Sequence, residues 1–175
     1  MTDAPEARIP AVRLVRLPTP LAVTAELREF MLSHPFEYGT GGGIGDTLQA
    51  DHAWQVVGDG DTVMGYAWAT RMTGTGMPHG LYLDMAILPP YQRCSVGSRT
   101  LAAVEHELRG LGVPVLYMQV NSTRPETGLR VRRWLLKAGY TLAARDETHG
   151  RLYERYTDEE YVLRCAMAVY LRKSL

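Results

Sequence analysis

The chain has 175 residues, 46% of them hydrophobic, which predicts one compact domain with a sizeable core. Its 19 basic side chains balance 19 acidic ones, so no basic excess indicates a nucleic-acid partner. Two distant cysteines and five histidines lack the spacing of a disulfide framework or a metal site. With no apolar signal segment and no run of about 18 apolar residues, we expect a cytoplasmic protein without a membrane partner.

The first third of the chain predicts a tail, a strand, a helix and a loop. Residues 1–10 are polar and are expected to form a flexible tail before a single domain at residues 11–175. Val12–Leu17 alternates like a strand, and apolar residues at helical spacing predict a helix over 21–34 that ends before a proline. The segment 36–49 contains GTGGGIG, whose spacing does not match a dinucleotide-binding motif. We interpret it as a loop, with its role left open.

A hairpin and then a strand, loop and helix occupy the centre. The apolar runs 54–57 and 63–72 flank Gly-Asp-Gly-Asp, which predicts a β-hairpin. Leu81–Leu88 reads as a buried strand around one charge, Asp84, and two prolines end it. From Gly97 the sequence predicts an amphipathic helix; its apolar stripe comprises Leu101, Val104, Leu108 and Leu111.

The polar loop between that strand and that helix has the chemistry of an anion site. The first N–H groups of a helix lack internal partners, and the helix dipole places partial positive charge there. Small residues such as Ser95 and Gly97 let a ligand approach the backbone, and Arg93 adds charge. No Gly-Lys-Ser/Thr and no GxGxxG is present, so nucleoside triphosphate and dinucleotide loops are disfavoured. A plain strand-turn-helix corner remains the alternative.

The C-terminal half predicts a further strand, a helix and two last strands. Val115–Val120 is expected to form a strand that finishes at Asn121, and 126–138 to form a helix capped by Gly139. The last two strands are predicted at 140–145 and 161–167, joined by a long polar segment. This order of elements predicts an α/β (α+β) mixed sheet with right-handed crossovers.

The stretch ILPPYQRCSVGS, residues 87–98, resembles the acyl-CoA signature of the GNAT superfamily of N-acetyltransferases. Gln92 and Gly97 match its Gln/Arg-x-x-Gly-x-Gly/Ala pattern, and Ser95 stands where the first glycine usually is. The Lys-Ala-Gly-Tyr segment that ends at Tyr140 resembles the family's Lys-x-Gly-Phe/Tyr. The resemblance implies a mixed, mostly antiparallel sheet of about seven strands with helices on both faces.

The resemblance also implies acetyl-CoA as the acyl donor. Backbone groups of one loop would bind the pyrophosphate of coenzyme A: Gln92, Arg93, Cys94, Ser95, Val96, Gly97 and Ser98. The main chain of Ala86 and Ile87, together with Asn121, would contact the pantetheine arm, which in the family enters between two strands that splay apart.

The catalytic groups are predicted less directly. Many family members place a proton-donating tyrosine where this chain has Leu135. Tyr117 and Tyr140 are candidate replacements, with ordinary core packing as the alternative for each. Asp84 is the only ionisable side chain in its strand and is the candidate proton acceptor for the amine. Its alternative is a structural carboxylate that caps a backbone or pairs with an arginine.

With this resemblance, the sequence predicts an acyl-CoA-dependent N-acyltransferase that acetylates a primary amine of a small molecule or peptide by direct attack. Two alternatives stay open: a non-catalytic acyl-CoA-binding module, and a scaffold in which Tyr161–Leu175 forms a homodimer. Cys94 at a helix N-terminus is a minor candidate nucleophile. The amine and the acyl-chain preference are not specified by any motif.

Overall fold

The computed structural model describes residues 11–34, 38, 43–71, 80–121, 125–143 and 168–175. In chain order the elements are β1 (Arg13–Leu17), β2 (Leu21–Ala22), α1 (Ala25–Leu32), β3 (Thr47–Leu48), β4 (His52–Val57), η2 (Asp59–Asp61), β5 (Val63–Arg71), β6 (Gly80–Ile87), η3 (Pro89–Tyr91), α2 (Val96–Gly110), β7 (Val115–Asn121), α3 (Pro125–Lys137), β8 (Thr141–Leu142) and β9 (Ala168–Ser174). None of the described helices is long and apolar enough to cross a membrane.

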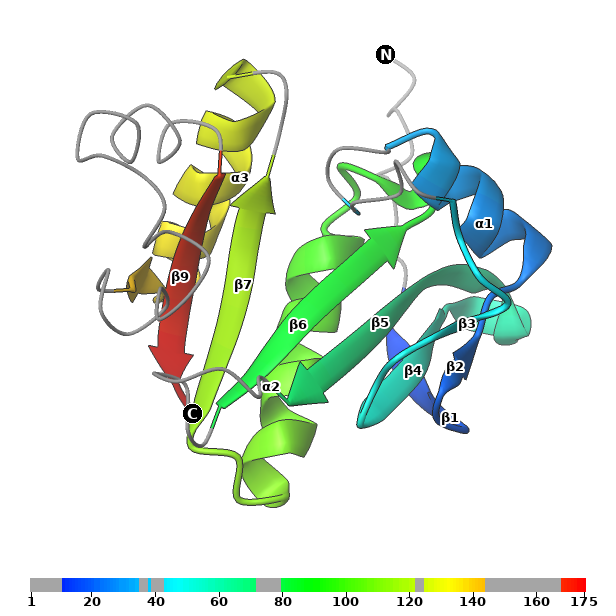
Figure 1. The fold of residues 1–175 in the computed structure, drawn as a ribbon, viewed down its shortest axis with the longest axis horizontal. Coiled ribbons are helices and arrows are strands. Elements are labelled where there is room, and N and C mark those ends of the chain that lie inside the picture. The colour runs from blue at the N-terminus through cyan, green and yellow to red at the C-terminus, as the bar shows by residue number, and fades with distance from the viewer. Residues whose placement is uncertain (1–10, 35–37, 39–42, 72–79, 122–124, 144–167) are drawn as a thin grey trace, which may run out of the picture.

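The main sheet has seven strands in the order β1-β4-β5-β6-β7-β9-β8 (Figure 1). Its pairs are antiparallel except for β6 and β7, which run parallel. This confirms the expected mixed, mostly antiparallel sheet. The parallel pair is joined through α2, the crossover that such a pair requires.

The predicted helices and the hairpin form, and the N-terminal helix is shorter than predicted. The N-terminal helix begins at Ala25 rather than near residue 21, because Thr24 caps it by accepting a hydrogen bond from the Leu27 N–H group. Residues 21–22 instead pair with β3 in a separate two-stranded sheet. The hairpin of β4 and β5 turns through η2 as expected.

The C-terminal strands differ from the prediction. Within the described part of the strand expected at 140–145, which ends at residue 143, Thr141–Leu142 forms β8. The strand expected at 161–167 and the tail at 1–10 lie outside the described residues. An unexpected strand, β9 at Ala168–Ser174, lies between β7 and β8 and pairs with β7 along all its seven residues.

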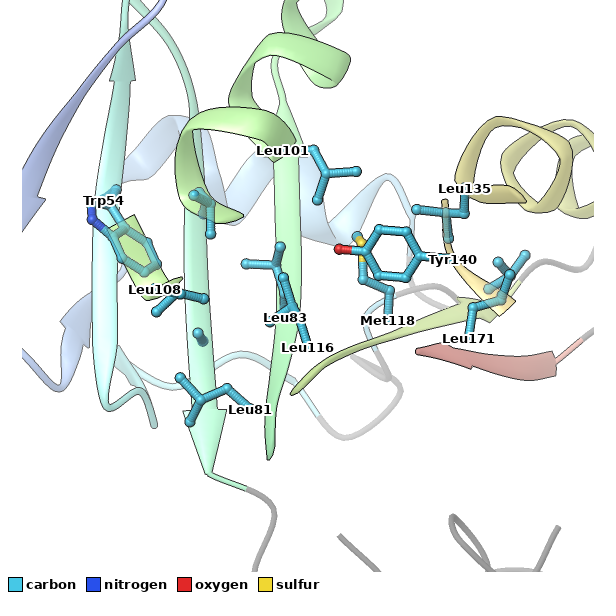
Figure 2. Packing of buried hydrophobic residues seen from close by; sticks show 14 residues of the cluster. Trp54, Leu81, Leu83, Leu101, Leu108, Leu116, Met118, Leu135, Tyr140 and Leu171 are labelled. Atoms are coloured by element: carbon cyan, nitrogen blue, oxygen red, sulfur yellow. The ribbon is translucent and has the colours of Figure 1, made fainter. Parts of the chain in front are cut away.

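Helices cover both faces of the sheet. The larger core cluster joins α2 and α3 to one face through residues such as Leu101, Leu108 and Leu135 (Figure 2). A second cluster joins Leu27 and Phe30 of α1 to the other face. Successive side chains of a strand alternate between these two faces.

The feature that positions the site is the divergence of β6 and β7. Their register covers only Gly80–Tyr82 against Val115–Tyr117, although β6 continues to Ile87 and β7 to Asn121. Figure 1 shows the two strands close at their amino ends and separating toward their carboxyl ends. Each strand keeps its outer neighbour, so the sheet stays continuous while its centre opens.

Candidate active site

A cavity of about 440 Å³ occupies the opening between β6 and β7. It is lined by residues from α1, β6, the loop before α2, the first turn of α2, β7 and α3, and by Tyr38 after α1: Phe30, Tyr38, Leu83, Asp84, Met85, Ile87, Gln92, Arg93, Ser95, Gly97, Ser98, Met118, Gln119, Val120, Thr127, Gly128, Arg130, Val131 and Trp134. Most of its surface is apolar, with a few polar groups at the strand and helix ends, as in small-molecule sites.

The cavity passes through the sheet from one face to the other. Leu83 and Met118, from the two diverging strands, belong to the core cluster on the α2 and α3 face. Strand alternation places Asp84 on the opposite, α1-covered face, as it does Tyr82 two residues earlier. Tyr117 pairs with Tyr82 in the register, so Gln119 projects from β7 on the Asp84 face. The cavity therefore connects the helix N-termini on one side with Asp84 and Gln119 on the other.

The loop before α2 has a backbone suited to an anion. Arg93 and Ser95 both have left-handed φ angles, 61° and 62°, which turn the chain tightly into the helix. Ser95 is the N-cap residue, but its side chain makes no capping hydrogen bond. The first N–H groups of α2 are thus left for a ligand or solvent. The first turn of α3, through Thr127 and Gly128, also reaches the cavity.

The structure brings most of the predicted loop residues to the cavity. Gln92, Arg93, Ser95, Gly97 and Ser98 line it. Two other predicted residues of the loop are absent from its lining. The exposed Cys94 contacts the Gln92 carbonyl with its thiol at 3.4 Å.

Val96, the other predicted loop residue outside the lining, is fully buried against Val56 and Met64. Its side chain anchors the first turn of α2 to the sheet. Any contribution of Val96 to an anion site would come from its main chain.

The main-chain groups that face the opening alternate along β6. The Ile87 carbonyl accepts a hydrogen bond from the Gln92 side chain at 2.9 Å, and the Met85 carbonyl accepts one from the Tyr38 hydroxyl at 2.7 Å. The Ala86 carbonyl points instead toward β5. It lies so close to Gly65 of that strand that a Cβ added there would be 2.3 Å from the carbonyl oxygen. Met85 and Ile87, rather than Ala86, thus present main-chain groups to the cavity.

Asp84 is the titratable carboxyl group of the cavity lining. Burial raises its pKa from 3.8 to about 7, and a hydrogen bond from the Tyr82 hydroxyl to its Oδ1, at 3.0 Å, opposes that rise. Burial, and next the neighbouring Asp84 charge, raise the pKa of Tyr82 well above its ordinary value, so Tyr82 stays a hydrogen-bond donor. A carboxyl with a pKa near neutrality can exchange a proton at physiological pH.

The two predicted tyrosines lie away from the cavity. Tyr117 is 3% exposed and packs with Tyr170 and Ala143. Tyr140 is 2% exposed in the core cluster, beside Leu135 and Met118 (Figure 2).

The Tyr140 hydroxyl has no hydrogen-bond partner among the described residues. Burial and the Glu105 carboxylate raise its pKa above the ordinary value. Leu135, at the position of the family's usual tyrosine, is fully buried and does not line the cavity either.

Several lining residues were not predicted. Phe30 and Tyr38 come from the N-terminal third, Gln119 from β7 and Trp134 from α3, where its indole donates to the Ser98 hydroxyl at 2.8 Å. Asn121 ends β7 beyond Gln119 and Val120. Alternation along β7 with Tyr117 would have placed Gln119 beside Asp84, had the strand register been known. Within the described residues no group of His, Cys, Asp and Glu side chains is arranged to hold a metal ion.

The chain belongs to the acetyltransferase (GNAT) family, whose model matches residues 25–140. That span runs from the first residue of α1 to Tyr140 and includes every cavity-lining residue described above. No curated protein matches the sequence. The stretch 87–98, which resembles the acyl-CoA signature, therefore lies inside the matched family domain, and acetyl-CoA or another acyl-CoA is the co-substrate of that family.

Solved structures with low sequence identity share the fold. A GNAT-family acetyltransferase from Staphylococcus aureus Mu50 aligns with a TM-score of 0.56 at 12% identity, over 94% of this chain and 99% of that one. The IAA acetyltransferase of Bacillus cereus gives 0.59 at 14%, over 94% and 100%. The ribosomal-protein-S18-alanine N-acetyltransferase of Escherichia coli gives 0.57 at 16%, over 94% of each chain.

Proposed function

We propose that this protein transfers an acetyl group from acetyl-CoA to a primary amine of a small molecule or peptide. The observation that carries the proposal is one cavity that joins the N-terminus of α2 to the Asp84 carboxyl through the opened sheet. An acyl donor and an amine could then enter from opposite faces and meet between β6 and β7.

The residues around α2 fit a pyrophosphate. Main-chain N–H groups of Gly97 and Ser98 belong to the uncapped first turn, and Arg93 lines the same wall. The Met85 and Ile87 carbonyls face the opening, where the pantetheine arm of coenzyme A can use hydrogen-bonding groups. Coenzyme A would supply the thioester that activates the acyl group.

Asp84 would accept a proton from the amine. An alkylamine with a pKa of about 10.4 must lose a proton before it attacks, which costs about 4.6 kcal/mol at pH 7. The amine nitrogen forms a bond to the acyl carbon, the carbon–sulfur bond breaks, and the surplus amine proton passes to the Asp84 carboxylate or through water to it. A carboxyl with a pKa of about 7 can be ionised to accept this proton and protonated after it, both near neutral pH.

The proposal assigns no tyrosine to the leaving thiolate. Tyr117 and Tyr140 do not line the cavity. A thiolate whose conjugate acid has a pKa of about 8.5 is an adequate leaving group at neutral pH, so a dedicated general acid is not required.

Gly97→Glu tests the coenzyme site. A Cβ at Gly97 would approach no neighbour closer than 3.9 Å, and a carboxylate in the first turn suits the helix dipole, so the fold should be retained. The added charge should weaken coenzyme A binding, measured by calorimetry, by at least about 100-fold through repulsion of the pyrophosphate.

Two variants control for charge and bulk. Gly97→Gln adds similar bulk without charge and should lose less affinity, whereas Ala102→Glu adds charge at an exposed position farther along α2 and should bind normally. Unchanged affinity in a folded Gly97→Glu variant would refute the assigned site. Thiol release from acetyl-CoA in the presence of an amine panel then separates an enzyme from a non-catalytic acyl-CoA-binding module.

A further inference from the structure

The α1 side of the cavity has a wall of aromatic rings that the proposed reaction does not itself require. Phe30 of α1 and Tyr38 both line the cavity together with Asp84. Their rings meet edge to face with centroids 5.7 Å apart, and the Tyr38 ring lies 6.1 Å from Trp68 of β5. Such pairs hold a hydrophobic surface in a defined orientation.

This wall is held in place from two directions. The Tyr38 hydroxyl donates to the Met85 carbonyl at 2.7 Å, which ties the ring to the strand that carries Asp84. The His34 ring stacks on the Phe30 ring with centroids 4.5 Å apart. A ligand that contacts the aromatic surface therefore needs to order few side chains, which favours affinity.

Among the described residues of the lining, the charge on this side is negative. Asp84 is the carboxyl group of the lining, and Gln119, on the same face of the sheet, contributes a neutral amide. The two arginines of the lining, Arg93 and Arg130, come from the loop before α2 and from α3, on the opposite side. Arg28 of α1 does not line the cavity.

Three hydrogen bonds hold the Arg28 guanidinium against residues 44–46, which do not line the cavity. Its nitrogens contact the Ile44 carbonyl at 2.6 Å, the Gly45 carbonyl at 3.1 Å and the Asp46 carboxylate at 3.0 Å. Among the described residues that line the cavity, no arginine or lysine comes from the α1 side.

We infer that the acceptor is a monoamine whose amino group sits on an aromatic or aliphatic body and that has no carboxylate beside the amine, a conclusion that rests on the proposed function. The ammonium form is attracted to Asp84 and to the faces of Phe30 and Tyr38. The body covers the aromatic wall. An α-amino acid would bring its carboxylate toward Asp84, and a polyamine would bury a second ammonium without a second carboxylate in the described lining.

Selectivity among four simple amines tests this inference. Phenethylamine, ethylamine, phenylalanine and spermidine are compared at saturating acetyl-CoA by thiol release. We expect kcat/KM for phenethylamine to exceed that for ethylamine and for spermidine by at least about tenfold, and that for phenylalanine by about 100-fold. A preference for phenylalanine or spermidine would overturn the inference and leave the acyltransferase proposal standing.

Direct binding separates this inference from the proposed activity. Phenethylamine and phenylalanine are titrated by calorimetry into the protein saturated with coenzyme A. Tighter binding of phenethylamine, by about tenfold or more, supports the acceptor class even if no amine is turned over. Absence of phenethylamine binding, or tighter binding of phenylalanine, would overturn it.

The aromatic wall is tested with Phe30→Leu, which keeps most of the apolar volume and so protects the fold. We expect the ratio of kcat/KM for phenethylamine to that for ethylamine to fall by about fivefold, with KM for acetyl-CoA unchanged. Leu32→Ala, at a position on α1 that is 52% exposed, is the matched control and should keep the wild-type ratio. An unchanged ratio in Phe30→Leu would contradict a role for this wall in selecting the amine.

Discussion

Asp84→Asn should make the protein more stable and less active, because the proposed base is a carboxyl whose burial disfavours its charge. In the folded state its pKa is about 7, against an ordinary value of 3.8. A raised carboxyl pKa means that the folded state holds the proton more tightly than the unfolded state does. The contribution of Asp84 to the free energy of unfolding is therefore largest at low pH and is lost as pH rises from about 4 through about 7.

The size of that loss follows from the same values. At about 1.4 kcal/mol per pH unit, the difference between 3.8 and about 7 amounts to roughly 4 kcal/mol above pH 7. Asparagine has no such charge and keeps an oxygen that can accept the Tyr82 hydrogen bond. The variant should thus gain up to about 4 kcal/mol over wild type at pH 8 and almost nothing at pH 4.

Urea unfolding between pH 4 and pH 9 measures this difference, with Asp59→Asn at an exposed position as the control. In parallel, Asp84→Asn should lower kcat/KM for an amine by at least about 100-fold at pH 7 and remove the rise of rate with pH near 7. Parallel stability curves for wild type and Asp84→Asn across this range would refute the assigned burial. Unchanged activity would refute its role as the proton acceptor.

Three further substitutions probe the surroundings. Tyr82→Phe removes the hydrogen bond that lowers the Asp84 pKa, so the acidic limb of the pH–rate profile should move up by roughly one pH unit; an unmoved limb would show that the bond is not coupled to catalysis. Ser95→Gly should stabilise the fold by about 0.5–1 kcal/mol in urea unfolding, because serine is strained at φ 62°, and a loss of stability would contradict this. Lys173→Met leaves buried Glu105 without its partner at 2.6 Å and should cost about 3–5 kcal/mol; a cost below about 1 kcal/mol would contradict a dependence of the fold on this ion pair.

The loop proposed to bind coenzyme A was predicted from local signals in the sequence. Prolines end β6, small residues open α2, and an apolar stripe defines the helix, so the residues from Gln92 to Ser98 were found from neighbours in sequence. The loop's backbone chemistry depends on the helix N-terminus, which is a local property. Five of its seven predicted residues line the cavity.

Long-range pairing limited the rest of the prediction. The strand at Ala168–Ser174 was missed because its position is set by pairing with β7, about fifty residues earlier in the chain. Tyr117 and Tyr140 carry hydroxyls that the sequence alone could assign to a site or to the core, and packing placed both away from the cavity. Phe30 and Tyr38 gave no signal of a site, because aromatic residues at helical spacing usually indicate core.

The sequence by itself determined the family, the strand-loop-helix unit and the choice of Asp84 as the candidate base, since these depend on residue types and on short-range spacing. Only the tertiary structure decided the environment of Asp84 and hence its pKa. The divergence of β6 from β7 opens the sheet beside it, burial raises its pKa to about 7, and α1 brings aromatic rings to the same cavity. Each of these depends on which strands and helices meet in space, because burial and electrostatic environment are set by residues far apart in the chain.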